Sequence, residues 1–461
     1  MGSAQKTGNE ISRTIFRMMR TISVVPVIAL ISALLTPSSA GAITLEEAKK
    51  EALKSNISLK MENEKVLGAL SVKNDKLTKL FPSLNVAGDE AHSDKEPRVV
   101  LNTGEYGTYP LIGSIPSQDI EAFVGKRDTY SATVQFQQPI FEGGKIYYTY
   151  LSSKAHEDIS RWDEKQTTQD VLFSVEQAYF NLLKSEEIYR HDLKHEDDMK
   201  AHLNDIEIKY KEGRVSLNDV LKVKVEEVRA NESVIKSDNG RQVAKGRINV
   251  LLNRPFAAPV EEPRPGTLTV EEGRRLAQLN RPAIKSAVAG IEEAAYKRRV
   301  AEGGYFPDLK FVAEYNKQTE QPTTLDENWT VMVTLRYTLF EWGAAGERVN
   351  AARAVERQME YNKLMIENQI ASDVWQSWLK IQETDKRIEV TKVASAQAEE
   401  NLRIVKFGFS HGARTSTDVL DAEDLYSRTS LDSINARYDA YLSRSLFRYS
   451  IGILTAQSNE P

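Results

Sequence analysis

Three histidines are the residues whose type and spacing come closest to metal chemistry in this sequence. His191, His195 and His202 are separated by four and seven residues, so a helix would place their imidazoles along one stripe. Such a stripe can chelate a divalent metal ion. The neighbouring residues Asp192 and 196–198 are all acidic, however, which is typical of a solvated charged face. We therefore predict an exposed helix surface here, with no bound metal and no cofactor.

A second group of charged residues follows two glycine turns. Asp219 lies six residues after Gly213, and Asp418 lies six residues after Gly412. A carboxylate in the first turn of a helix interacts favourably with the helix dipole, and for Asp219 this explanation is as good as a functional one. Asp418 and Asp421 are three residues apart and share a helical face, so for this pair we favour a functional role.

Catalysis is not predicted by any set of residues. No nucleophile stands beside a base, and no glycine-rich loop follows a strand. The sequence contains no cysteine, which excludes disulfides and thiol chemistry. The formal net charge of -5 implies no basic surface for nucleic acid. Trp375 and Trp378 are interpreted as packing residues, and we expect a protein that is not an enzyme.

The charged turns belong to a stretch that occurs twice in the chain. Residues 141–144 (Phe-Glu-Gly-Gly) return 199 residues later as 340–343 (Phe-Glu-Trp-Gly), and the glycine turns return at the same offset. An internal repeat fixes the domain count better than length does. We expect a signal segment at 1–42, a first repeat at 43–265 and a second repeat at 266–461.

Residues 1–42 are typical of a secretory signal. Arginines precede the apolar run 22–35, and small residues end the segment. The run is shorter than the ~20 residues of a spanning helix, and Pro26 interrupts it. A start at Met18 or Met19 would leave a more ordinary signal. Since no later apolar run is long enough to span a membrane, we expect an exported protein whose strands make any membrane crossing.

Each repeat contains two segments with the alternating pattern of half-exposed strands. We expect these strands at about 83–93, 128–139, 308–317 and 327–339. The apolar residues that we predict to face lipid are Tyr130, Val134, Phe136, Trp329, Val331, Val333 and Leu335. Residues 93–126, which separate the first two strands, are rich in glycine and proline and are predicted to form an exposed loop.

The remaining segments have helical character and matching lengths. Residues 145–212 contain neither glycine nor proline, so as one helix they would extend about 100 Å. The counterpart in the second repeat, 347–407, is slightly shorter. Shorter helical segments of about 37 residues are expected at 44–80, 216–252, 269–305 and 415–451. Two of them end to end would match one long helix, and prolines in 255–265 mark a linker between the repeats.

Four amphipathic strands cannot close a barrel in one chain. An open sheet edge in lipid leaves backbone groups unpaired at several kcal/mol each, and the smallest membrane barrels have about eight strands. A symmetric trimer would supply twelve strands above a ring of long helices, which would form a duct. The alternative is an exported coiled-coil scaffold or adhesion protein whose strands form a soluble sheet.

Several motifs in both repeats resemble the TolC family of outer-membrane efflux proteins. They are the Thr-Leu-Glu-Glu-Ala opening at 44–48, Phe-Pro-x-Leu at 81–84 and 306–309, the strand end 138–144 and the turn 412–422. The resemblance implies an α+β membrane protein. Its protomer would be a tandem repeat of long coiled-coil helices with four transmembrane strands. Three protomers would form a 12-stranded β-barrel on a 12-helix α-barrel.

The resemblance also implies a function and partners. The protein would be the outer-membrane exit duct of a tripartite efflux or type I secretion system, with a long periplasmic extension. A periplasmic membrane-fusion adaptor and an inner-membrane pump of the RND or ABC type would dock at its tip. The tip turns expected to contact the adaptor comprise Gly213, Arg214, Val215, Gly412, Ala413 and Arg414. The expected periplasmic aperture comprises Asp418, Asp421, Arg414, Asp219 and Asn218, and Arg414 is expected to pair with Asp219.

Overall fold

The structure is a computed structural model of the whole chain. It describes residues 44–96, 98–102, 108–109, 113–114, 119–123, 127–253, 269–318 and 327–455. The signal segment and the proline-rich linker that the sequence predicts lie outside these residues.

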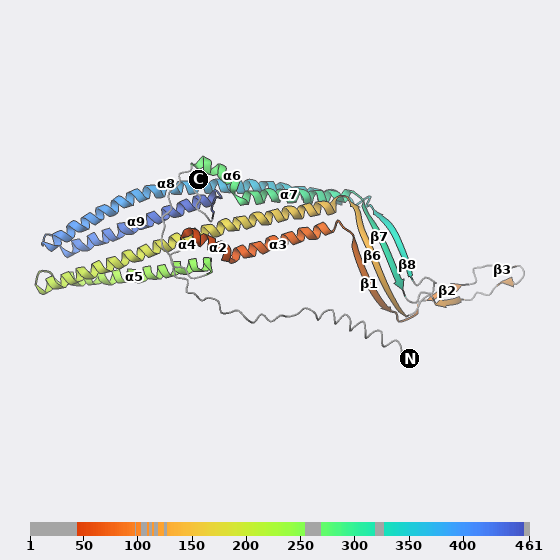
Figure 1. Cartoon of the computed structure of the whole chain (residues 1–461), viewed down its shortest axis with the longest axis horizontal. Helices are drawn as coiled ribbons and strands as arrows, with labels where there is room; N and C mark the ends of the chain where they lie inside the picture. Colours follow the sequence, from red (N-terminus) through yellow and green to blue (C-terminus); the bar gives the residue numbers. More distant parts are fainter. Residues whose placement is uncertain are drawn as a thin grey trace, which may run out of the picture. The chain divides into compact units, whose positions relative to one another are not determined.

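Long helices dominate the described part of the chain (Figure 1). Two of them, α4 (Lys145–Lys211) and α8 (Ala344–Ser410), have 67 residues each. Both begin directly after glycines in the left-handed region, Gly144 (φ 80°) and Gly343 (φ 83°), a conformation that ends the preceding segment. The other α-helices among the described residues are α2 (Leu45–Ser55), α3 (Ile57–Thr78), α5 (Leu217–Leu252), α6 (Val270–Asn280), α7 (Pro282–Glu302) and α9 (Ser416–Ser450).

Two segments that the sequence predicts as single helices are each divided. The segment 44–80 breaks at Asn56, whose extended backbone ends α2 and whose side chain accepts from Ser58 N to cap α3. The segment 269–305 breaks at Arg281, because Pro282 occupies the first position of α7. The prediction of continuous helices was wrong at these two residues, where a capping asparagine and a proline restart the chain.

The four expected strands form one antiparallel sheet in the order β1-β6-β7-β8. They are β1 (Ser83–His92), β6 (Asp128–Glu142), β7 (Asp308–Gln318) and β8 (Glu327–Arg336). The central pair, β6 and β7, joins the first repeat to the second, and β1 and β8 are edge strands. The last strand ends at Arg336, three residues before the expected end.

The segment 93–126 is not simply a loop. Within its described residues, β2 (Arg98–Asn102) pairs with β5 (Asp119–Phe123), and β3 (Thr108–Tyr109) pairs with β4 (Gly113–Ser114). The hairpin of β1 and β6 therefore continues beyond the main sheet (Figure 1). These strand pairs were not predicted because the glycines and prolines of the segment interrupt the alternation of apolar and polar residues by which strands are recognised.

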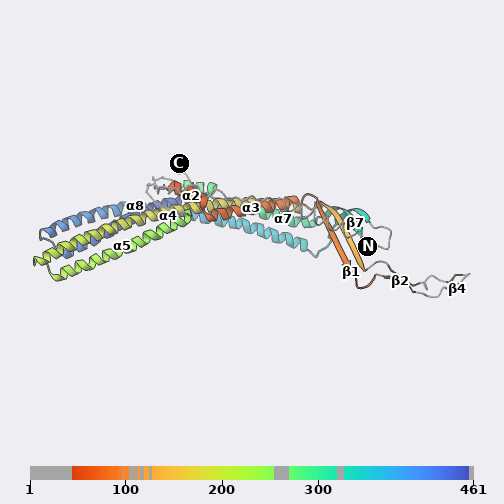
Figure 2. The ribbon, with the colours of Figure 1, turned by 60° about the horizontal axis from the view of Figure 1, so that its bottom comes forward.

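Four of the helices, α4, α5, α8 and α9, are arranged as two hairpins that contact each other. α4 packs along α5, α8 packs along α9, and α4 also packs along α9 (Figure 2). The largest apolar cluster lies among α2, α4, α5 and α9 and contains Tyr179, Phe180 and Ile248. A second cluster near the turns at the ends of α4 and α8 includes Ile206 and Phe409.

Candidate functional site

The main sheet has one apolar face and one polar face. Antiparallel register aligns Val86, Val134, Tyr315 and Trp329 in one row across all four strands, and directly opposed residues share a face. The row one residue away consists of Asn85, Gln135, Glu314 and Thr330. The seven residues predicted to face lipid all lie on the apolar face.

The apolar face is open to its surroundings in the single chain. Trp329 is 76% exposed and Val333 is 61% exposed. Along β6, Tyr130, Val134 and Phe136 are more exposed than the alternate residues. Nothing in the described part of the chain covers this face, whereas apolar patches of a soluble protein are usually small or functional.

Aromatic residues lie where strands meet helices. Phe81 precedes β1, Phe141 is the next-to-last residue of β6, Phe306 precedes β7, and Phe340 and Trp342 follow β8. All five side chains are exposed. Trp342 has a positive φ of 54°, which is uncommon for any residue other than glycine. Trp342 occupies the position that corresponds to Gly143 in the first repeat. The second repeat therefore has an exposed aromatic side chain at a backbone conformation that favours glycine.

The two tip turns have the same backbone geometry. Gly213 (φ 72°) and Gly412 (φ 75°) both occupy the left-handed region, which glycine adopts without steric cost. After Gly213, Arg214 N donates to Lys209 O at 2.9 Å, and after Gly412, Ala413 N donates to Gly408 O at 2.8 Å.

The side chains of the turns differ in their surroundings. Arg214 is exposed and pairs with Glu212 at 3.2 Å. Val215 is half-buried against the apolar cluster at the tip, and Ala413 is exposed. The side chains of Arg214 and Ala413 are thus available at the surface, whereas Val215 also packs against the apolar cluster.

Asp219 and Asp418 each complete a capping box. The Asp219 carboxylate accepts from Ser216 N and Ser216 Oγ, and the Asp418 carboxylate accepts from Thr415 N and Thr415 Oγ1. These hydrogen bonds hold the pKa of both carboxyls below the ordinary value. The helix-start explanation therefore accounts for both aspartates. Their role at an aperture stays a prediction.

The other residues of the expected aperture are open to solvent. Asn218 and Asp421 are exposed. The stem of Arg414 lies over Gly408, where an added Cβ would be 2.7 Å from Arg414 Cγ. Among the described residues, no ion pair joins Arg414 to Asp219. The expected pairing is therefore not made within one chain, and pairing between copies stays a prediction.

The histidine stripe is not the solvated face that the sequence predicts. His202 is 6% exposed, and Asp192 and Glu196 are buried. His202 Nε2 lies 3.2 Å from Ser416 Oγ of α9, and His195 Nδ1 lies 4.0 Å from Glu423 Oε2. The prediction failed because acidic residues were taken as a sign of solvent, although they also occur at helix contacts when they are paired.

Across the described residues, no group of three or more potential His, Asp or Glu ligands comes together. Glu423 and Lys406, whose side chains meet beside His195, are not among the residues predicted from the sequence. They are 17 residues apart, on either side of the turn between α8 and α9. Only the folding of these two helices into a hairpin brings them together.

Trp375 and Trp378 stack on each other, with ring centroids 5.5 Å apart and planes at 22°. Trp378 packs against the apolar cluster of α6, α8 and α9. Arg274 of α6 lies over the Trp375 ring at 5.7 Å. These contacts agree with the packing role that the sequence suggests.

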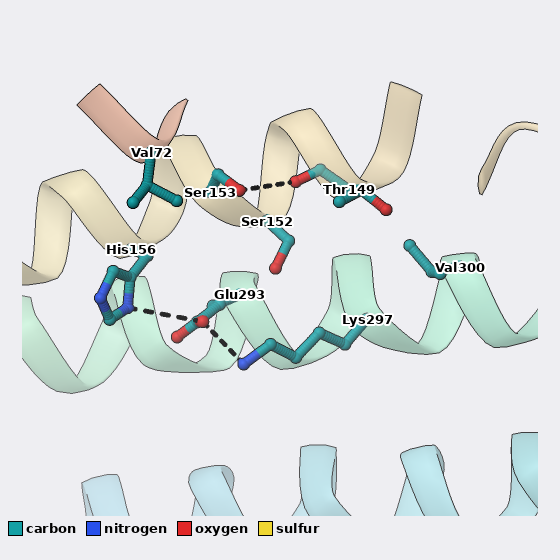
Figure 3. A pocket seen from close by; sticks show the side chains of 8 residues that line it. All are labelled: Val72, Thr149, Ser152, Ser153, His156, Glu293, Lys297 and Val300. Atoms are coloured by element: carbon teal, nitrogen blue, oxygen red, sulfur yellow. Dashed lines mark hydrogen bonds and ion pairs between the residues drawn. The ribbon is translucent and has the colours of Figure 1, made fainter. Parts of the chain in front are cut away.

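A groove of about 380 Å³ lies among α3, α4 and α7 (Figure 3). Its charged residues engage one another: Lys297 pairs with Glu293 at 2.7 Å, and His156 Nδ1 lies 3.5 Å from the same carboxylate. Ser153 donates to Thr149 O within α4. The polar groups are thus largely satisfied by their own neighbours, and the groove coincides with none of the predicted site residues.

No helix in the described ranges combines the length and the apolar character needed to cross a membrane.

Comparison with known families gives one match in each half of the chain. The family described as outer membrane efflux protein matches residues 78–254 and 274–450. Among curated proteins, outer membrane protein TolC of Escherichia coli (strain K12) is 23% identical over 370 residues, covering 71% of this chain and 70% of the relative. TolC of Vibrio cholerae serotype O1 is 23% identical over 354 residues, covering 72% and 78%.

Solved structures have the same fold. Outer membrane protein VceC from Vibrio cholerae matches with a TM-score of 0.73 at 18% identity, covering 88% of this chain and 96% of that chain. The CmeC outer membrane channel of Campylobacter jejuni matches with a TM-score of 0.75 at 14% identity, covering 88% and 85%. The long helices and the four-stranded sheet thus have the fold of these two solved chains.

Proposed function

The chain belongs to the outer membrane efflux protein family, and from this premise we propose how its copies assemble and what they contact. The protein is an outer-membrane exit duct for efflux or secretion, and it is a transport protein rather than an enzyme. This membership decides against an exported scaffold or adhesion protein. The observation that carries the assembly is the two-faced sheet with unpaired edges.

Three copies form one closed barrel in this proposal. The edge strands β1 and β8 each carry one unpaired row of backbone groups in the single chain. Joining β8 of one copy to β1 of the next satisfies these groups, as lipid requires. Four strands from each of three copies give twelve, with Val134, Val333 and the rest of the apolar face toward lipid.

The aromatic junction residues mark the periplasmic border of the membrane. Girdles of aromatic residues flank the apolar band of membrane barrels, and amphipathic rings favour the headgroup level. Phe141 and Phe306 meet edge to face with centroids 6.3 Å apart, and Phe340 and Trp342 lie 4.9 Å apart. The helices that follow then extend into the periplasm.

The tip turns are the docking surface for a periplasmic adaptor in this proposal. They close the ends of α4 and α8 that are opposite the sheet, and Arg214, Ala413 and Arg414 are exposed there. A membrane-fusion adaptor held by an inner-membrane pump of the RND or ABC type would reach the duct at this end. Asp418 and Asp421, three of each in a trimer, would line its aperture.

Membrane fractionation tests this function. The account predicts that the protein is recovered in detergent extracts of the outer membrane, because the apolar sheet face is covered only there. Its periplasmic part should be cleaved by protease added to spheroplasts, whereas the barrel should be protected. Recovery from the soluble periplasm would contradict the proposal.

A further inference from the structure

The contact between α4 and α9 joins the two helical hairpins of one chain, and we refer to it as the α4–α9 seam (Figures 1 and 2). Polar residues cross this seam at intervals along its length. They differ in kind between the half near the sheet and the half near the tip turns.

The sheet-proximal half is joined by ion pairs of arginine or lysine with carboxylates. Arg448 of α9 reaches Glu176 of α4 at 3.2 Å, and Asp439 of α9 reaches Lys184 of α4 at 3.2 Å. Arg437 also pairs with Glu187. Histidine is the side chain whose charge ordinarily changes between pH 5 and 8, and none of these three contacts contains one.

The tip-proximal half is joined by histidines instead. His202 of α4 lies 3.2 Å from Ser416 Oγ, in the first turn of α9, and its ring packs edge-on against Phe409 of α8 at 5.4 Å. His195 of α4 faces Glu423 of α9, a carboxylate that is 1% exposed and contacts Lys406 of α8. The surrounding apolar cluster does not titrate.

We propose that His195 and His202 form an acid-sensitive latch, which holds the tip-proximal half of α4 against α9 when both imidazoles are neutral and releases it when they are protonated. The latch lies within one chain, so it goes beyond the proposed duct and does not depend on which partner docks at the tip. Its release would loosen the two hairpins near the aperture.

The charges around each histidine are consistent with this behaviour. Burial is the main cause that lowers the pKa of His202 to about 4; Asp205 opposes it, whereas Lys406 of α8 and Lys209 lower the pKa further. The contact from α9 is the uncharged Ser416. A neutral imidazole is therefore strongly favoured at this position.

His195 is shifted in the same direction by burial. Its pKa is lowered even though Glu423 of α9 and the α4 carboxylates Asp192 and Asp198 raise it, and His191 lowers it further. Lys406 of α8 already neutralises Glu423, which reduces the attraction between Glu423 and a protonated His195. Both histidines thus favour release of the seam when they gain a proton.

Proton linkage gives the sign and the size of the effect. Because the closed seam lowers the pKa of His202, its stabilising effect is complete above the ordinary histidine pKa and decreases as pH falls toward about 4. If the released imidazole regains a pKa of about 6.5, a change from pH 7.5 to 5 favours release up to roughly 25-fold through His202 alone.

Spin-label distances across the seam test the latch. The chain has no native cysteine, so Asn204→Cys in α4 and Asp424→Cys in α9 provide a tip pair, and Lys165→Cys and Leu446→Cys provide a sheet-proximal control pair. Trimers with one labelled copy are obtained by co-expression with excess unlabelled chain. We expect a second, longer distance to appear for the tip pair between pH 7.5 and 5, while the control pair stays unchanged.

Replacing His195 and His202 with residues that cannot be protonated tests whether these histidines cause the change in distance. His195→Gln with His202→Gln keeps hydrogen-bonding groups at both positions but cannot gain a proton, so the tip distance should not respond to pH. His156→Gln, an exposed histidine of α4, should respond like the wild type. The latch would be refuted by an unchanged wild-type distance at pH 5, or by a change of equal size in the double variant.

Discussion

Phe136 and Phe311 meet edge to face across β6 and β7, with ring centroids 6.1 Å apart and planes at 77°. Phe136 belongs to the first repeat and Phe311 to the second. Their contact therefore fastens the two repeats together on the apolar face of the sheet. Aromatic pairs of this geometry contribute about 0.5–1.5 kcal/mol beyond their buried area. Each repeat supplies two of the four strands of this sheet.

A cation on the apolar face should hinder assembly. If Val134 and Val333 face lipid as proposed, Val134→Arg or Val333→Arg places a charge there, which costs about 2 to 4 kcal/mol near the middle of the bilayer. We expect less protein in the outer membrane and less trimer, measured by fractionation and native mass. Thr133→Arg and Thr334→Arg, which lie on the opposite face, are the matched controls. Equal effects on both faces would show that the strand orientation is wrong.

Replacing the tip aspartates with asparagine should weaken the block of the channel by cations. In planar-bilayer recordings of the purified protein, Asp418→Asn with Asp421→Asn should reduce block by multivalent cations added on the periplasmic side, because the proposed ring of six carboxylates would no longer attract them. Since hydrogen bonds from Thr415 lower the pKa of Asp418, the block in the wild type should persist at pH 5. Asp424→Asn is the exposed control. Unchanged block in the double variant would leave only the capping role.

Loss of the arginine in the second tip turn should loosen the closed end. Arg414→Ser removes the side chain whose stem covers Gly408 and whose charge lies beside Asp418. We expect a higher single-channel conductance without adaptor. Arg214→Ser, at the corresponding place in the first turn, should change conductance less, because Arg214 pairs with Glu212 in its own turn. A conductance equal to that of the wild type would argue against Arg414 as a closing residue.

The buried carboxylate Glu176 should be important for stability. It is 0% exposed and contacts Lys49 of α2 as well as Arg448 of α9, which it joins at 3.2 Å. Glu176→Gln leaves two cations without their partner, and breaking a buried pair costs about 3–5 kcal/mol. Denaturant unfolding in detergent measures this loss. Glu400→Gln, at an exposed pair with Arg403, is the control and should change the stability much less.

The sequence predicts the fold well because the patterns that indicate helices and strands occur in both repeats. Long stretches without glycine or proline indicate α4 and α8, and alternation indicates the apolar rows of β6 and β8. The division of two helices at Asn56 and Arg281 was missed, since a single cap or proline interrupts a segment without changing its period.

The tip site was only partly predictable. Gly213 and Gly412 have the turn conformation that their residue type suggests. The contacts of His195 and His202 with α9 could not be predicted, because they depend on how two hairpins from different repeats pack together. Local acidity around the histidines indicated solvent, and only the tertiary structure places them in a helix contact.

The size of the particle in detergent tests the central claim most directly. β1 and β8 have free edges in the single chain, so the duct exists only when copies join. Native mass measurement of protein extracted from the outer membrane should give three copies of the mature chain as the smallest stable unit. A sample that contains only monomers, while remaining folded, would contradict the account.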